Sequence, residues 1–243
     1  MADGETVLAA LAERLGARGP LDAADVQAIV VLPCSLRHYE ANQYILRERD
    51  LPKYCSFLVR GMVFRHKIVA DGGRQIVSIH LPGDVIDPQN ILLGEADHNI
   101  QALTAASVAQ IARGDMLDLC FAHPNVGKAL WRETLIEASI FREWVANVGR
   151  RDARARTAHM ICELATRREA AGLGLRDSYE LPMTQEQLGD ALGLTAVHVN
   201  RTLRALQDDG LIGRSKRSVR IADWERLRTA ADFTSNYLHL NQR

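Results

Sequence analysis

The chain has 243 residues, 47% of them hydrophobic, which is enough for one large domain or two modest ones. Its 30 Lys and Arg residues balance 30 Asp and Glu residues, so no overall basic charge favours nucleic acid, and only a local basic patch can do so. No apolar run approaches the ~20 residues of a membrane span and no signal peptide is evident, so we expect a cytoplasmic protein without a membrane partner.

Two helices are predicted at the start of the chain, at residues 6–18 and 20–32, the second after the start signal Pro20-Leu21-Asp22. From Leu36 to Ile111 the pattern changes to short strands, separated by turns such as Asp71-Gly72-Gly73. Roughly eight strands in about 75 residues indicate a small antiparallel barrel or roll. We expect a short helix within residues 87–98.

The four cysteines, Cys34, Cys55, Cys120 and Cys162, lie far apart and have no CxxC spacing. This pattern is unlike a zinc or iron–sulfur site, so we expect no bound metal and reduced thiols. Cys120 and Cys162 lie at helical positions that favour a buried structural role. Oxidation of a cysteine is the alternative that stays open.

A long helix is predicted from Pro124 to about Gly149. Its apolar residues are too many for one stripe, so it needs two apolar neighbours. One is the barrel, and the other is most simply the same helix of a second copy, packed as a coiled coil. A helix buried within one domain is the alternative. The dimer contacts that we expect are Ile136, Ile140, Phe141, Trp144 and Val148.

Residues 183–212 predict two short helices joined by a tight turn. Thr184 followed by Gln187 is a capping-box signature for the first helix. Gly193 permits the positive φ that often ends a helix, and Thr195 is a good N-cap for the second. Residues 149–152, which break the helical pattern upstream, mark a domain boundary.

The second of these helices has an unusual outer face. Val199, Leu203 and Leu206 form its inner stripe, and the opposite face carries Val197, Asn200, Arg201 and Arg204. In the major groove of DNA, Arg reads guanine, Asn reads adenine and an apolar group meets the thymine methyl. The face therefore suits DNA, although a solvated helix of an ordinary domain would also satisfy the helical pattern.

Basic residues continue beyond this helix. Residues 211–221 alternate like a β-hairpin, and the hairpin carries Arg214, Lys216, Arg217 and Arg220. Between residues 193 and 222 there are six Lys and Arg against two acids, so the segment has a net charge of +4. A basic hairpin after a helix-turn-helix indicates a wing that contacts DNA phosphates.

Together, several motifs resemble those of the Crp/Fnr family of bacterial transcription regulators: Gln187 to Thr195, Val199 to Leu203, Gly210 to Ile212, and the turns Arg60-Gly61 and Leu81 to Asp84. The resemblance covers nearly the whole chain and implies an α+β fold. It implies a β-roll sensor domain with flanking helices at residues 1–123, a dimerisation helix at 124–150 and a winged helix-turn-helix at 151–243.

The resemblance implies a homodimeric activator that binds a palindromic promoter site through a recognition helix at residues 195–208. Its partners would be double-stranded DNA and RNA polymerase. Arg201 matches the family's guanine-contacting arginine, and Val197 or a neighbour replaces a glutamate of the cyclic-AMP-responsive and Fnr-like members. The positions expected near phosphates are Gln185, Thr195, His198, Lys216 and Arg217, and Thr184 is also expected to bind DNA. No acid lies between residues 195 and 207, so we expect a different preferred half-site.

The cyclic-AMP-binding members carry a Gly-Glu pair after the Gly-Asp turn and an Arg-Ser pair further on. Here Asp87 and Pro88 stand at the first pair, and the second falls near His98 and Asn99, with no arginine within residues 75–112. A cyclic phosphate beside Asp87 without an arginine would be poorly stabilised. The sequence therefore predicts no cyclic AMP cofactor and a FixK-like or similar member of the family.

The sequence leaves some other effectors of the sensor domain open. No cysteine precedes Cys34, so the N-terminal cluster of the Fnr-type oxygen sensor is not expected. Haem bound by His66, His80 or His98 is an alternative, although lone histidines on strands are more often packed or surface residues. An effector-gated repressor or dual regulator, sensing a small molecule, haem or redox state, is the second hypothesis.

A third hypothesis is a ligand-binding module whose winged helix contacts protein, and the +4 charge of residues 193–222 argues against it. No paired carboxylates, Ser-His-Asp set or glycine-rich phosphate loop has a usable spacing, so we do not expect an enzyme.

Overall fold

A computed structural model of the chain describes residues 4–215 and 217–240. The described chain forms two compact units, one containing residues 4–66 and 79–138 and the other residues 67–78 and 139–240. The division falls inside the long helix α4 (Pro124–Arg150), which the sequence predicts at 124–149. The fold is α+β, as predicted.

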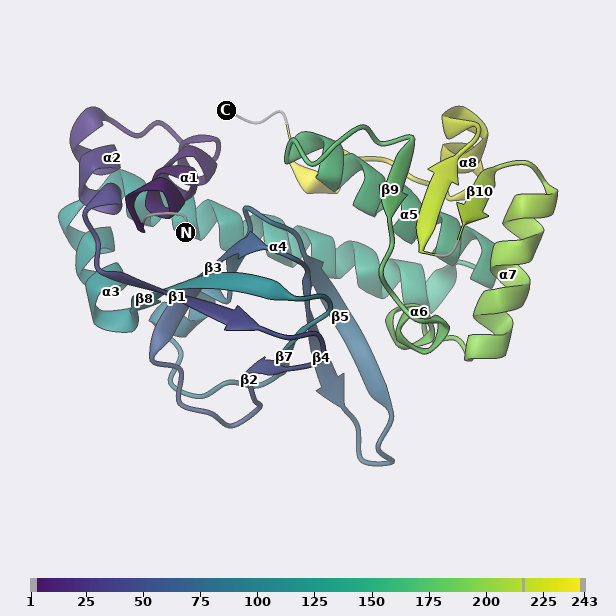
Figure 1. Ribbon diagram of the computed structural model, residues 1–243, viewed down its shortest axis with the longest axis horizontal. Helices are drawn as coiled ribbons and strands as arrows, with labels where there is room; N and C mark the ends of the chain where they lie inside the picture. The colour runs from purple at the N-terminus through teal and green to yellow at the C-terminus, as the bar shows by residue number, and fades with distance from the viewer. Residues whose placement is uncertain (1–3, 216, 241–243) are drawn as a thin grey trace. The chain divides into compact units, whose positions relative to one another are not determined.

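The first unit begins with two helices, α1 (Gly4–Gly16) and α2 (Ala23–Val30), which pack side by side (Figure 1). Asp22 is the N-cap of α2, and its side chain accepts a hydrogen bond from the Asp25 backbone N–H at 2.8 Å. The Asp25 carboxylate accepts from the Asp22 N–H in return, which completes a capping box. The predicted second helix therefore exists but begins three residues later than expected.

Eight strands between residues 34 and 112 form two four-stranded sheets, which confirms the predicted roll. The first sheet has the order β1 (Cys34–Tyr39), β8 (Ala106–Ala112), β3 (Tyr54–Arg60), β6 (Val85–Ile86). The second has the order β2 (Tyr44–Leu46), β7 (Asn99–Ala102), β4 (Val63–Ile68), β5 (Arg74–His80). The pairs β1–β8, β3–β8 and β4–β7 are antiparallel. The expected short helix is the 3₁₀ helix η1 (Pro88–Ile91).

The core of the roll is built from inward residues of both sheets. Leu58 and Val108 of the first sheet pack with Val63 and Ile100 of the second, and all four are at most 2% exposed. Burial of such a side chain stabilises the fold by about 1.5–3 kcal/mol. Gly61 turns the chain between β3 and β4 at φ +85°, where a Cβ would lie 2.3 Å from a backbone oxygen, so no other residue fits.

A second core joins the N-terminal helices to the roll and to the helices that follow it. Leu8, Leu11 and Leu15 of α1 pack in one cluster with Met116 of α3 (Arg113–Ala122) and Val126 of α4. The alternation of the strands predicts the roll core, but only the structure shows this second core, to which α1 contributes.

The second unit contains the predicted winged helix-turn-helix. Its elements are α5 (Ala153–Ala170), α6 (Gln185–Leu192), α7 (Ala196–Asp208), β10 (Ile212–Ser215), β11 (Ser218–Ile221) and two elements that the sequence does not predict, β9 (Ser178–Glu180) and α8 (Trp224–Ala230). β9 pairs with β11, so the wing is a three-stranded sheet. Helix α5 packs against both α7 and α8.

Glu163 of α5 joins α5 to the second half of α4 and to the 3₁₀ helix η2 (Asn236–Leu238). The Trp144 indole N–H donates to both Glu163 carboxylate oxygens, at 3.1 and 3.0 Å, and the Tyr237 hydroxyl donates to Glu163 Oε2 at 2.8 Å. Because Glu163 is fully buried, these donors and Arg167 are what make its burial tolerable. No helix within residues 4–215 and 217–240 has the length and apolar character that a membrane crossing requires.

Candidate functional site

The turn between α6 and α7 is held by local contacts that the sequence predicts. The Thr184 hydroxyl accepts from the Gln187 N–H at 3.1 Å, and the Gln187 side chain accepts from the Thr184 N–H at 2.9 Å. Gly193 ends α6 in the left-handed region at φ +62°. Thr195 caps α7 by accepting from the His198 N–H at 3.2 Å. The two threonines therefore fix the start of each helix.

Helix α7 presents the predicted outer face to solvent. Its inner stripe of Val199, Leu203 and Leu206 is at most 1% exposed, and this stripe anchors the helix in the unit. On the opposite side Val197 is 80% exposed, more than any other large hydrophobic residue in the described part of the chain. A partner that has both phosphates and apolar groups could cover such an exposed aliphatic surface beside basic residues.

A shallow groove runs along this face and brings most of the predicted recognition residues together. The groove is lined by Gln185, Ala196, Val197, Asn200, Arg201, Arg204, Ala205 and Asp208. Arg201 and Arg204 are exposed, and within the described part of the chain no ion pair holds either guanidinium. Both side chains are therefore free to reach a ligand in the groove.

Asp209, the acidic residue that follows the groove residue Asp208, is neutralised by an arginine of α5. Asp209 forms an ion pair with Arg154 of α5 at 2.5 Å, and its backbone oxygen accepts from Arg226 at 3.2 Å. Asp208 is thus the single acidic residue that lines the groove. The sequence does not predict this pairing, because Arg154 lies 55 residues away from its partner.

The wing adds basic residues next to α7. Arg217 and Arg220 are exposed, and Arg214 is half-buried on β10. The predicted phosphate contact Lys216 lies outside the described residues. β9 supports the hairpin through the Val219–Tyr179 pair, and the Tyr179 hydroxyl donates to the Ile161 backbone oxygen at 2.9 Å.

The five residues predicted at a dimer interface do not share one exposed stripe of α4. Ile136 is 6% exposed and Trp144 is 8% exposed, so both pack inside their own chain. Ile140, Phe141 and Val148 are half-buried. The indole of Trp144 faces inward because its N–H donates to the buried Glu163 carboxylate.

A different stripe of α4 is exposed and largely apolar. Trp131, Leu135 and Val145 are 69%, 55% and 74% exposed, and half-buried Ala138 and exposed Arg142 lie between them. The five residues follow each other at spacings of four and three, which is the heptad spacing of a coiled-coil seam. We call Trp131, Leu135, Ala138, Arg142 and Val145 the α4 seam.

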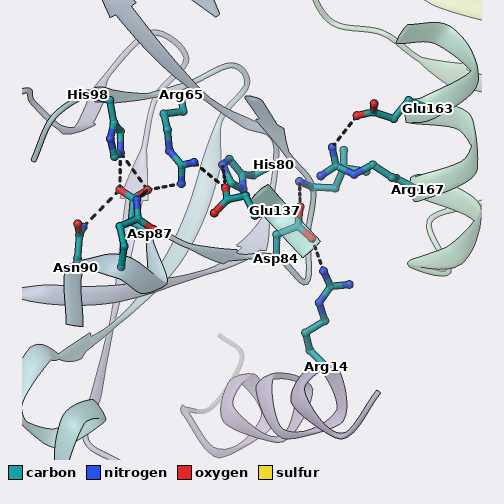
Figure 2. Close-up of polar contacts among 12 residues, drawn as sticks. Arg14, Arg65, His80, Asp84, Asp87, Asn90, His98, Glu137, Glu163 and Arg167 are labelled. Carbon is teal, nitrogen blue, oxygen red and sulfur yellow. Dashed lines mark hydrogen bonds and ion pairs between the residues drawn. The ribbon is translucent and has the colours of Figure 1, made fainter. Parts of the chain in front are cut away.

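A buried polar cluster in the first unit surrounds Asp87, one of the two residues that the sequence aligns with the family's Gly-Glu pair (Figure 2). Arg65 of β4 pairs with Asp87 and also donates to Glu137 of α4 at 2.7 Å. His98 Nε2 lies 3.1 Å from both Asp87 carboxylate oxygens. Arg65 therefore contacts two carboxylates, one that follows β6 and one on α4.

The electrostatics of this cluster favour its charged form. Burial raises the pKa of Asp87, but the Arg65 guanidinium and His98 outweigh burial and hold that pKa well below its usual value. Burial lowers the pKa of His98, but its hydrogen bond to Asp87 and the Asp87 charge raise that pKa above the ordinary value overall. The Asp87 carboxylate is thus ionised and fully engaged.

The other candidate sensor residues lie in separate surroundings. His66 stands beside the rings of Tyr44 and Phe64, with ring centroids 5.9 and 5.4 Å away. His80 Nε2 lies 3.7 Å from the Glu137 carboxylate. With His98 on Asp87, the three predicted haem-ligand candidates are each packed against neighbours from their own unit.

The four cysteines are free thiols, and burial raises the pKa of each of them. For Cys55 and Cys162 the pKa reaches about 12. Since the thiolate is the reactive form, these surroundings disfavour thiol chemistry.

Two family models match the chain, one over the roll and one over the helix-turn-helix. Residues 36–123 match the family model of a cyclic nucleotide-binding domain, and residues 155–230 match that of a Crp-like helix-turn-helix domain. The chain is 32% identical to the transcriptional activator protein FnrL of Cereibacter sphaeroides over 197 residues, covering 79% of this chain and 78% of that protein.

Two further similarities extend this result. The chain is 28% identical to the nitrogen fixation regulation protein FixK of Bradyrhizobium diazoefficiens, and the match covers 79% of each chain. The solved structure of FixK2 from Bradyrhizobium japonicum superposes with a TM-score of 0.75 at 28% identity, covering 82% of this chain and 98% of that one. The chain is a DNA-binding transcription regulator and belongs to the Crp/Fnr family.

Proposed function

We propose that the protein is a homodimeric transcription activator that reads a palindromic promoter site with one α7 helix in each half-site. The observation that supports this most is the outer face of α7, on which Val197, Asn200, Arg201 and Arg204 are gathered in one groove. A major-groove reader needs such a combination of Arg, amide and apolar groups.

Each residue of this face has a role that its chemistry suggests. Arg201 would donate to the O6 and N7 of guanine, and Asn200 would pair with adenine. Val197 would meet a thymine methyl. Because no acidic residue lies between residues 195 and 207, where such a relative carries its glutamate, we expect an operator that differs from those of relatives with a recognition-helix glutamate. Thr195 and Arg217 would contact phosphates.

The dimer would form through the α4 seam of two chains. A seam of Trp131, Leu135 and Val145 leaves a large apolar area in water in a single chain. Heptad spacing lets the same stripe of a second copy bury this area, and twofold symmetry would then match the palindrome. The two recognition helices would be about 34 Å apart, one turn of DNA.

Activation is supported by the relative FnrL, which is named a transcriptional activator protein. An activator must contact RNA polymerase, and both partners meet on DNA in the cytoplasm. Cyclic AMP is not the effector in this proposal, because the sequence has no arginine where the cyclic-AMP-binding members carry their Arg-Ser pair, and a cyclic phosphate beside the Asp87 carboxylate would be poorly stabilised. A regulator, and not an enzyme, is the role that fits this site.

The test combines genome-wide mapping of bound sites with a gel-shift titration of the mapped palindrome. Arg201→Ala should weaken specific binding by roughly 1–3 kcal/mol per half-site. Arg228→Ala is the matched control, because Arg228 is an exposed arginine on α8 that pairs with Glu225 and lies outside the groove. If Arg201→Ala binds the palindrome as tightly as the parent, α7 is not the reader.

A further inference from the structure

The polar cluster of the roll is organised around Asp87, whose backbone is in an unusual conformation. Asp87 has φ +53° and ψ +55°, in the left-handed region, and directly precedes Pro88. Both features are unfavourable for a residue with a side chain, and their cost has to be offset by other interactions. Asp87 is the N-cap of η1, but its side chain makes no capping hydrogen bond. Its carboxylate therefore does not cap the helix but contacts other side chains.

Hydrogen-bond donors from several side chains surround the Asp87 carboxylate (Figure 2). Asp87 accepts from the guanidinium of Arg65, from Gln89 Nε2 at 3.0 Å and from Asn90 Nδ2 at 3.4 Å, with His98 Nε2 at 3.1 Å. The side chain of Asp87 is 2% exposed, and that of Arg65 is 4% exposed. An arginine, a histidine and two amides, arranged around one buried carboxylate, have the composition of an oxyanion site.

The same cluster reaches the long helix. Arg65 donates through Nη2 to Asp87 and through Nη1 to Glu137 of α4, so one guanidinium joins the loop after β6 to α4. Without Asp87, the nearly fully buried Arg65 would keep Glu137 as a carboxylate partner at Nη1 but would have no carboxylate partner at Nη2. Removing one member of such a buried pair is strongly destabilising, because the remaining charge is left without compensation.

We propose that Arg65, His98 and the Asn90 amide form a buried oxyanion site whose occupant in this protein is its own Asp87 carboxylate. The roll thus carries an anion that is tethered to its own chain. Arg65 is held on Glu137 of α4 without any added effector. The consequence for DNA binding rests on the proposed function, but the site itself does not.

The site is tested by removing the tether and supplying a free carboxylate. Asp87→Ala deletes the anion and leaves Arg65 and His98 facing the space of the missing carboxylate. The variant should melt roughly 6–20 °C below the parent. Sodium formate should raise its melting temperature in a saturable way, whereas sodium chloride at equal ionic strength and the neutral isostere formamide should not.

Asp84→Ala is the matched control. Asp84 is a nearby aspartate that pairs with Arg14 at 3.0 Å, but both side chains are partly exposed to solvent. Formate should therefore shift Asp84→Ala and the parent no more than chloride does. Equal formate shifts for Asp87→Ala and Asp84→Ala would overturn the proposal, as would an Asp87→Ala variant that melts at the parent temperature.

A second variant serves if Asp87→Ala does not fold. Asp87→Asn keeps the shape of the side chain and removes the charge, so it should melt well below the parent, and amides around Glu137 should exchange hydrogen faster. Parent-like melting and exchange in Asp87→Asn would show that no anion is needed.

The link to DNA binding is measured separately. In a gel shift without added effector, Asp87→Ala should bind the operator about tenfold more weakly than the parent, and formate should restore its affinity. If the parent itself binds no DNA while formate still rescues folding, the proposed function fails and the oxyanion site stands. If DNA binding is normal and formate has no effect on melting, the oxyanion site fails alone.

Discussion

Gly189 of α6 lies directly against the Leu194 backbone oxygen, so that a Cβ at position 189 would come within 2.4 Å of that oxygen. The Leu194 N–H in turn donates to the Gly189 oxygen at 3.0 Å. The chain can make its tight turn between α6 and α7 because position 189 has no side chain. The orientation of α7 relative to α6 therefore depends on the absence of a side chain at position 189.

Gly189→Ala should lower the free energy of unfolding by roughly 1–3 kcal/mol, because the backbone at Leu194 must move to accept the methyl group. DNA affinity should fall as α7 tilts. Urea denaturation and a gel shift measure the two effects. Gly114→Ala in α3 is the control, since a Cβ there has no neighbour within 4 Å, and it should cost nothing measurable. Equal stability of the two variants would contradict the close approach of Gly189 to Leu194.

The helix-turn-helix was predictable because its signals are local. Thr184 and Thr195 stand at the cap positions that the sequence indicates, and the structure confirms both helices. β9 could not be predicted, because a three-residue strand within a loop becomes a strand only by pairing with β11. The Arg154–Asp209 ion pair is equally invisible to local patterns.

Arg217→Ala should weaken binding to specific and random DNA by similar factors, because an exposed wing arginine meets phosphates and not base edges. The slope of log affinity against log salt concentration should become shallower by ~0.9 for each phosphate that the variant no longer neutralises. Filter binding or fluorescence anisotropy at several salt concentrations measures this slope. An unchanged slope, with binding otherwise intact, would place Arg217 outside the interface.

Val145→Glu should convert a dimer to a monomer, because it puts a charge into the apolar α4 seam of both copies. Sedimentation equilibrium measures the change. Arg150→Glu is the control: it changes the charge of the same helix by more, at an exposed position off the seam. The seam assignment would be wrong if Val145→Glu remained as dimeric as Arg150→Glu.

The sequence predicted the long helix α4 but not the residues of its exposed stripe. The pattern of α4 holds two apolar stripes, and periodicity alone does not say which one faces the chain's own interior. Trp144 is turned inward by Glu163, which lies 19 residues further on in another helix. Arg65 poses the same problem in the roll, since its partners Asp87 and Glu137 follow it by 22 and 72 residues.

The Asp87–His98 pair should make the free energy of unfolding decrease as the pH rises. The pKa of His98 is raised above its ordinary value of about 6.5, because its bonds to Asp87 and Asp97 outweigh burial and the nearby Arg65 charge. The folded state then binds more protons than the unfolded state between these two values, so stability falls as the pH rises. The stabilisation is fully present below about pH 6.5 and is lost as the pH passes the raised value.

His98→Gln should remove this dependence, because glutamine has no charge to lose. Urea denaturation of the parent between about pH 6 and pH 9 should show a free energy of unfolding that decreases with pH more steeply than in His98→Gln. His38→Gln is the control, since His38 is an exposed histidine that contacts Ser107 and no carboxylate in the described structure. The variant His98→Gln should be the less stable of the two at the acidic end of this range, and the difference should shrink toward the alkaline end. A difference that stays constant over the range would mean that His98 contributes shape but no charge to the cluster.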